Sequence, residues 1–178
     1  MNIVKYPLIF VPLRNGLIAG LLGILIFVAI FYLGQHPIMI APYLDYRIFL
    51  FGVFIFFTCK EIRDNYQEGI LYFWQAMTGS YLVVFVATII GSLGLLLFAS
   101  IESTFVRSYI ERMTNYLMTF PPDAIEGIGK EIYERNLELL PATNAMDLME
   151  TYFIQGIVIG FFVSIILSAI LRKQPKTN

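Results

Sequence analysis

The sequence predicts an all-α membrane protein, a bundle of four membrane-spanning helices with an extracytoplasmic helical hairpin between spans three and four. Three observations lead to this fold class. Apolar residues make up 58% of the 178 residues and charged residues only 14%, whereas an ordinary globular domain is roughly 25% charged. The apolar residues lie in long uncharged runs, as a bilayer core requires. Residues 102–147, by contrast, are charged and have apolar residues at helical spacing.

The first span is predicted at about residues 15–34, which carry no charge. At about 1.5 Å per residue, this run matches the thickness of a bilayer core. Asn15 is expected to cap the helix and Gly34 to end it. Because Pro7 and Pro12 punctuate the apolar residues before it, that preceding segment is expected to lie at the interface and not to form a regular helix.

The second span is predicted at about residues 43–62, although its uncharged part is short. Asp45 and Arg47 are expected at its outer boundary, and Lys60 and Glu61 at its inner boundary. Long basic side chains can extend from such positions to the lipid headgroups.

The third and fourth spans are predicted at about residues 71–100 and 148–171. The uncharged run 69–101 is longer than one crossing needs and too short for two crossings and a turn, so it is expected to be one long helix. Asn144 is expected to cap the fourth span, with Asp147 at the favourable end of the helix dipole.

The segment 102–147 between them is predicted to form a hairpin of two amphipathic helices. The dipeptide Pro121-Pro122 ends the first helix and begins the second, and Pro141 ends the second. Each helix has an apolar stripe, and oppositely charged residues four positions apart flank the second stripe. The first stripe contains Phe105, Tyr109, Met113, Tyr116 and Leu117, the second Ile125, Ile128, Ile132 and Leu139, and the charged pairs are Glu126/Lys130 and Glu131/Arg135.

The distribution of charge predicts the orientation of these spans. The two termini and the segment between spans two and three hold seven basic and three acidic residues, and the other two aqueous segments hold five basic and ten acidic residues. Cytoplasmic segments are enriched in Lys and Arg. Both termini are therefore expected in the cytoplasm and the hairpin outside.

The scarcity of reactive side chains excludes several classes of site. With one cysteine, Cys59, and one histidine, His36, the chain can form neither an intrachain disulfide nor a Cys/His zinc site. Cys59 is interpreted as a buried small residue and His36 as a solvated turn residue. No catalytic, metal-binding or cofactor-binding residue is predicted, and the net charge of −1 predicts no binding to nucleic acid.

Small residues recur at four-residue spacing in three of the predicted spans. This spacing lets helix backbones approach closely, so these residues are predicted to pack the helices of the bundle together, the alternative being that they bind a partner subunit. The predicted packing residues are Gly16, Gly20, Gly91, Gly156, Gly160, Ser164 and Ser168.

Several uncharged polar side chains lie within or near the spans. They are interpreted as hydrogen-bonding at headgroup level or between helices, with a solute path as the alternative. Spans one, three and four contain no ionisable group at mid-membrane depth, which disfavours a proton- or ion-coupled carrier. The candidate intramembrane polar residues are Gln75, Thr78, Ser80, Thr88 and Gln155.

Three parts of the chain resemble the bacterial membrane-protein family catalogued as domain of unknown function 4199. They are Asn15-Gly16-Leu17-Ile18-Ala19-Gly20; the turn Lys60-Glu61-Ile62-Arg63-Asp64-Asn65-Tyr66 with Gly69-Ile70-Leu71-Tyr72-Phe73-Trp74-Gln75-Ala76 after it; and the acidic helical insert before a last span that ends Ile170-Leu171-Arg172-Lys173. The resemblance implies a four-span protein of the bacterial inner membrane, of a kind known mainly from Bacteroidetes. It implies no activity, cofactor or catalytic residue.

Three functions are weighed. The first is a non-enzymatic accessory, assembly or scaffolding subunit, which would contact the lipid bilayer and another membrane protein or a second copy of itself. The second is a transporter or channel component. The third is a lipid-acting enzyme, for which Glu102 and Glu150 would have to meet at the outer ends of spans three and four.

Overall fold

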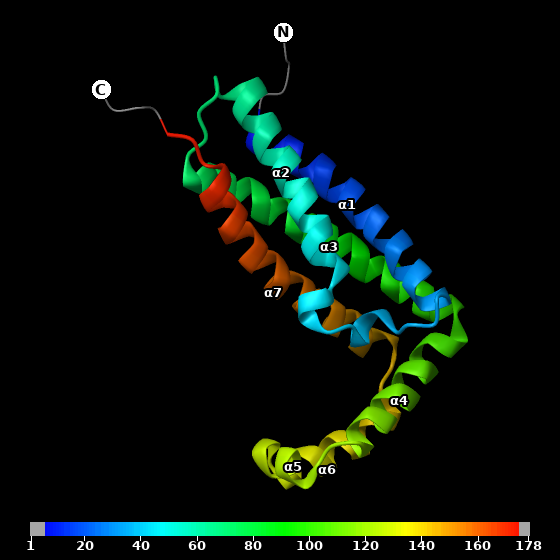
Figure 1. Ribbon diagram of the computed structural model, residues 1–178. Helices are drawn as coiled ribbons and strands as arrows, with labels where there is room; N and C mark the ends of the chain where they lie inside the picture. Colours follow the sequence, from blue (N-terminus) through cyan, green and yellow to red (C-terminus); the bar gives the residue numbers. More distant parts are fainter. Residues whose placement is uncertain (1–5, 175–178) are drawn as a thin grey trace.

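The computed structural model describes residues 6–174, and this part of the chain is all-α, without a β-strand. Four long helices lie side by side: α1 (Pro7–Tyr32), α2 (Tyr46–Tyr66), α3 (Phe73–Ile101) and α7 (Ala145–Leu171). Three shorter helices project from one end of this group, and the start of α1 and the end of α7 lie at the opposite end (Figure 1).

Of the long helices, α1, α3 and α7 are long and apolar enough to cross a membrane. The sequence predicts four such spans, but the helix at the second position, α2, does not meet this standard. The reason is charge, because α2 has Arg47 in its first turn and ends in a charged segment that includes Lys60 and Asp64. Nevertheless α2 packs against each of the other three long helices.

Helix α1 begins at Pro7, so the predictions of an irregular lead and of Asn15 as the N-cap are wrong. Pro7 lies in the first turn, where a missing N–H costs no hydrogen bond. Pro12 lies farther inside and removes one backbone hydrogen bond, a cost that the long helix tolerates. Asn15 is buried within the helix, and its side-chain amide donates a hydrogen bond of 2.9 Å to Oγ1 of Thr58 in α2.

The predicted end of α1 is confirmed. Gly34 has a φ of +87°, in the left-handed region that favours glycine. The N–H of Gly34 donates to the carbonyl of Phe31, and the N–H of Gln35 donates to that of Ile30, which is a Schellman motif. Two 3₁₀-helices follow in the connection to α2, η1 (Pro37–Met39) and η2 (Pro42–Leu44).

The predicted cap of α7 is also confirmed. The Asn144 side chain accepts hydrogen bonds from the N–H groups of Met146 and Asp147, and the Asp147 carboxylate accepts one from the N–H of Asn144. This reciprocal arrangement is a capping box. At the other end of α7, Leu71 and Lys173 exchange two backbone hydrogen bonds of 2.9 and 2.8 Å, which fasten the segment before α3 to the end of α7.

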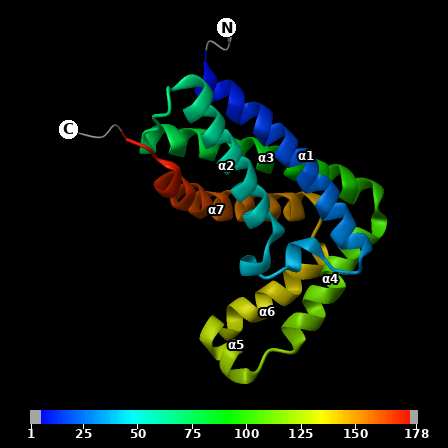
Figure 2. The same ribbon diagram turned by 45° about the horizontal axis from the view of Figure 1, so that its top comes forward.

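The hairpin contains three helices where the sequence predicts two. They are α4 (Ser103–Met118), α5 (Pro122–Ile128) and α6 (Lys130–Leu139), followed by the 3₁₀-helix η3 (Leu140–Ala142) that returns the chain to α7 (Figure 2). Gly129, with a φ of +96°, separates α5 from α6. The break lies between Glu126 and Lys130, and Lys130 pairs instead with Glu134, at 3.7 Å.

The base of the hairpin is held by an aromatic cluster. Phe105 of α4 is fully buried. Its ring centroid lies 5.2 Å from that of Phe31, 5.4 Å from that of Phe27 and 5.5 Å from that of Phe98. One side chain thus packs α4 against the ends of both α1 and α3.

Candidate functional site

A buried ion pair lies at the start of α2. Asp45 caps this helix, since its carboxylate accepts a hydrogen bond of 2.9 Å from the N–H of Arg47. The Arg47 guanidinium returns to the same carboxylate, with Nε 2.9 and 3.0 Å from its two oxygens. The side chains of Arg47 and Asp45 are only 3% and 5% exposed. A charge-assisted pair of this kind is stronger than a hydrogen bond between neutral groups.

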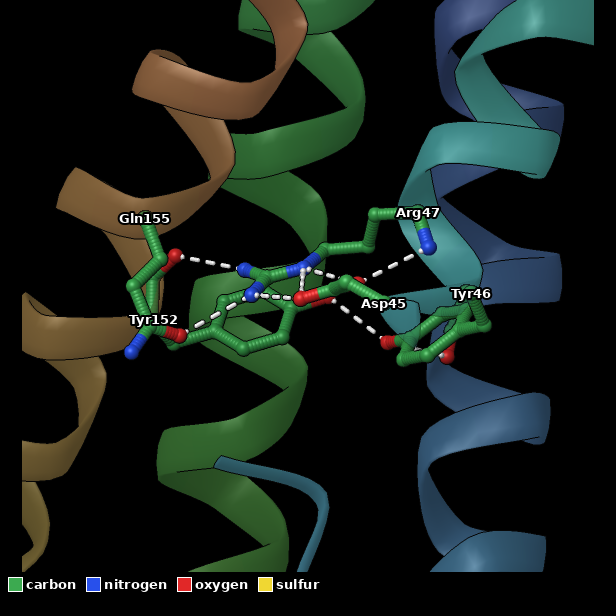
Figure 3. Close-up of polar contacts among 6 residues, drawn as sticks. Asp45, Tyr46, Arg47, Tyr152 and Gln155 are labelled. Atoms are coloured by element: carbon green, nitrogen blue, oxygen red, sulfur yellow. Dashed lines mark hydrogen bonds and ion pairs between the residues drawn. The ribbon is translucent and has the colours of Figure 1, made fainter. Parts of the chain in front are cut away.

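The same guanidinium extends from α2 to α7 (Figure 3). Its Nη1 donates to the backbone carbonyl of Tyr152 at 2.9 Å, and its Nη2 donates to Oε1 of Gln155 at 3.0 Å. The Cζ atom lies 4.3 Å from the centroid of the Tyr152 ring, a cation–π distance. Gly156, one position after Gln155, leaves room for Thr88 of α3, because a Cβ there would lie 2.8 Å from Cγ2 of Thr88.

Two tyrosines extend the network to α1. The hydroxyls of Tyr46 and Tyr152 lie 3.0 Å apart, and the Tyr46 hydroxyl donates to the backbone carbonyl of Gly23 at 3.3 Å. Side chains of α2 and α7 therefore join three of the long helices. We refer to Asp45, Tyr46, Arg47, Tyr152 and Gln155 as the Arg47 cluster.

The Arg47 cluster is suited to holding helices together and not to acid–base catalysis. Its two charges neutralise each other, and the carboxylate is already engaged by the guanidinium. No group of three or more His, Cys, Asp or Glu that could hold a metal ion occurs among residues 6–174.

The prediction that Arg47 extends to the headgroups is wrong, because its side chain turns inward. Its partners on α7 lie 105 and 108 positions away in the chain, and nothing local indicates them. The sequence contains two signals of this site. Asp45 stands two positions before Arg47 at the start of a helix, and Gln155 is a polar residue in the uncharged run 151–171.

The predicted packing glycines lie at contacts between the long helices. A Cβ on Gly16 or Gly20 of α1 would lie 2.9 Å from Cβ of Val86 or 2.7 Å from Cβ of Ile90 in α3. Between α3 and α7, Gly91 lies against Tyr152, Gly156 against Thr88 and Gly160 against Val84. Ser164 and Ser168 are fully buried.

The candidate polar residues do not line one path. Ser80 lies 3.2 Å from Ser168, hydroxyl to hydroxyl, and 3.6 Å from Sγ of Cys59, which is buried as predicted. Thr88 is buried separately, beside Gly156. Gln75 accepts from the N–H of Tyr72 at 2.9 Å, Thr78 donates to the carbonyl of Trp74 at 2.8 Å, and Gln155 belongs to the Arg47 cluster.

Glu102, on which the hypothesis of a lipid-acting enzyme depends, caps α4. Its carboxylate accepts from Oγ1 and from the N–H of Thr104, at 2.6 and 3.2 Å, and from the Tyr32 hydroxyl at 3.2 Å. The hydrogen bonds from Thr104 lower the pKa of Glu102, because they stabilise its charged form. This side chain is therefore an ionised cap.

His36 is buried, so its prediction as a solvated turn residue is wrong. The ring lies 4.6 Å from that of Phe105 and 5.3 Å from that of Tyr109, between centroids, and Nε2 lies 3.3 Å from the Phe105 carbonyl. Nδ1 has no hydrogen-bond partner in the described part of the chain. Burial lowers the pKa of His36 from 6.5 to about 4, and the charge of Arg112 contributes in the same direction.

Acidification is expected to destabilise the protein through His36. Since the pKa is 6.5 when the ring is free and about 4 when it is buried, the unfolded chain binds the extra proton. Neutral His36 makes its full contribution to the free energy of unfolding above about pH 6.5. This contribution declines as the pH falls and is lost at about pH 4, which lowers the free energy of unfolding by roughly 3 kcal/mol. Thermal unfolding in detergent between pH 7.5 and pH 4.5 measures it. His36→Gln should flatten the profile in this window, and an unchanged slope would contradict the assignment.

Comparison with known proteins identifies a family. The family described as "Protein of unknown function (DUF4199)" matches residues 14–173. No curated protein and no solved structure matches the chain.

Proposed function

The chain belongs to the DUF4199 family of proteins of unknown function, and we propose that it is a non-enzymatic accessory or assembly subunit of the bacterial inner membrane. In this proposal α1, α2, α3 and α7 form a four-helix bundle that crosses the membrane four times. Both termini lie in the cytoplasm, and the extracytoplasmic hairpin α4–α6 binds a partner protein.

The proposed crossing of α2 is supported by the way its charges are paired. Asp45 neutralises Arg47 at one end. At the other end Arg14 of α1 pairs with Glu61, and Arg63 pairs with Asp64 at 2.7 Å. The Asp45–Arg47 pair is buried inside the bundle, where a paired charge is far less costly in a membrane than a charge that faces lipid. Composition alone therefore underestimates how well α2 fits among the other three helices.

Cysteine labelling tests this topology, with little background because the native Cys59 is buried. Tyr43→Cys lies before α2, and Asn65→Cys lies near its end, both at exposed positions. A membrane-impermeant maleimide should label Tyr43→Cys in spheroplasts and Asn65→Cys only after permeabilisation. Labelling of both variants in intact spheroplasts would show that α2 does not cross, and the reverse pattern would invert the topology.

The observation that carries the proposed partner binding is the exposed apolar surface of the hairpin. Within α4 to α6 only Phe105 is buried. Ile132 and Leu139 of α6 are 55% and 56% exposed. Helices that lie on membranes have polar faces rich in Lys and Arg, whereas acidic residues outnumber basic ones in this hairpin. These features favour a protein partner over the membrane surface.

Site-specific photocrosslinking in cells tests the proposed partner. A photoreactive amino acid at Ile132 or Leu139 should give the same discrete adduct. Glu134, which is exposed on the same helix, is the matched control position and should not give it. Ile132→Glu should abolish the adduct formed from position 139. No adduct at either apolar position, or equal adducts at all three, would rule out this face as the binding surface.

A further inference from the structure

A small pocket adjoins the Arg47 cluster between α7 and the connection that contains η1 and η2. Its volume is about 190 Å³. Asp45 and Gln155 form its polar part, and Ile40 and Pro42 of the connection face Val158 and neighbouring apolar residues of α7. The pocket is thus both polar and apolar, and it lies next to a buried network of hydrogen bonds.

The depth of this pocket in the membrane follows from its position on α7, if the topology proposed above holds. At about 1.5 Å per residue, Gln155 lies roughly 24 Å from Leu171, in a bilayer core of about 30 Å. Gln155 is then a few ångströms below the outer boundary of the hydrocarbon. The ester groups of glycerolipids lie at that boundary, just above this depth, and the first part of each acyl chain lies beside Gln155.

The size and surroundings of the pocket favour an acyl chain as its occupant. Ile154 and Val158 are more than half exposed on a helix that meets the standard of a membrane span, so the pocket is accessible from the lipid side. A volume of about 190 Å³ is too small for a transmembrane helix, which is about 10 Å across. It holds on the order of six water-sized groups, as in the upper part of one acyl chain.

The hydrogen bonds of the Arg47 cluster indicate which end of a lipid would bind. Oε1 of Gln155 accepts from Arg47, which leaves the amide nitrogen as the hydrogen-bond donor of this side chain. An amide N–H₂ needs an acceptor such as an ester carbonyl. Because Asp45 and Arg47 neutralise each other, the site carries no net charge that would select a charged headgroup.

We propose that this pocket binds the first part of one acyl chain of an outer-leaflet glycerolipid, with the Gln155 amide donating to its ester carbonyl. The chain lies against Ile154 and Val158. The lipid fills the space between α7 and the η1–η2 connection, beside the residues that hold α2 in place.

Paired lipids that differ only in the ester carbonyl test this proposal. Purified, delipidated protein in detergent is titrated with diacyl phosphatidylethanolamine or with its dialkyl-ether counterpart, and bound lipid is counted by native mass spectrometry. The ester lipid is expected to bind about tenfold more tightly, the effect of one hydrogen bond. Gln155→Leu should remove the preference, and Val158→Trp should fill the pocket and remove one bound lipid.

The control is Ile170→Trp, at an exposed position of the same helix, which should leave both lipids bound as in the wild type. Equal binding of ester and ether lipids by the wild-type protein would overturn the proposal, whether or not the variants fold. The result of this assay depends neither on the partner protein nor on the orientation of the chain in the membrane. A negative result here can therefore be distinguished from a negative result of the cysteine labelling or the crosslinking.

Discussion

Replacing Arg47 with leucine is expected to lower the free energy of unfolding by about 3–5 kcal/mol, the cost of leaving one partner of a buried ion pair without the other. Asp45 would lose its cationic partner in a site where its side chain is only 5% exposed. The carbonyl of Tyr152 and Oε1 of Gln155 would also lose a donor. Unfolding of the purified protein in mixed detergent micelles measures the change.

Two comparisons isolate the buried charge as the cause. The double variant Asp45→Asn/Arg47→Leu should lose less stability than Arg47→Leu alone, because Asn is neutral and still caps a helix well. Arg63→Leu breaks the pair with Asp64, which is partly exposed, and should cost less than about 1 kcal/mol. If Arg47→Leu were as mild as Arg63→Leu, the ion pair would not be buried as described.

Replacing Gly160 with leucine is expected to cost about 3 kcal/mol or more, because it overpacks the contact between α7 and α3. A Cβ at this position would meet both methyl groups of Val84 and lie 3.0 Å from its Cβ. Val84 is fully buried, and its β-branched side chain is too stiff to move aside. The helices must therefore separate, which should also change the elution of the protein in size exclusion.

Gly52→Leu is the matched control, since a Cβ at Gly52 has no atom within 4 Å. Both substitutions replace a helical glycine and gain about the same helix propensity. Gly52→Leu is therefore expected to be neutral or slightly stabilising. Equal effects at positions 52 and 160 would mean that α3 and α7 do not pack as closely as the structure has them.

Features of the fold that depend on local sequence were predictable. Long uncharged runs indicated α1, α3 and α7, and the cap at Asn144 and the stop at Gly34 depend on residues a few positions apart. The predictions of helix boundaries were wrong where the rest of the helix or a single glycine outweighed a local rule. A long helix tolerates Pro12 in α1, and Gly129 takes a positive φ that divides the predicted second hairpin helix.

Little of the candidate site could be predicted, because its contacts are distant in sequence. Arg47 meets residues of α7, and His36 meets the carbonyl of Phe105, 69 positions away. A charged or titratable side chain near the end of a span reads as solvated unless its partner is known. The sequence therefore shows Arg47 and His36 but does not show that they are buried.

The partners of Arg47 also bear on how the protein is made. During synthesis α2 emerges long before α7, and until then Arg47 has Asp45 but lacks the Tyr152 carbonyl and Gln155. An arginine near the centre of an inserting helix costs about 2.5–3.5 kcal/mol. In the proposed four-span topology, even an arginine near one end makes α2 the least favourable of the four helices to release into lipid. If α2 crosses the membrane as proposed above, α7 completes the site of Arg47, and α2 is expected to settle stably in the bilayer only after α7 has been translated.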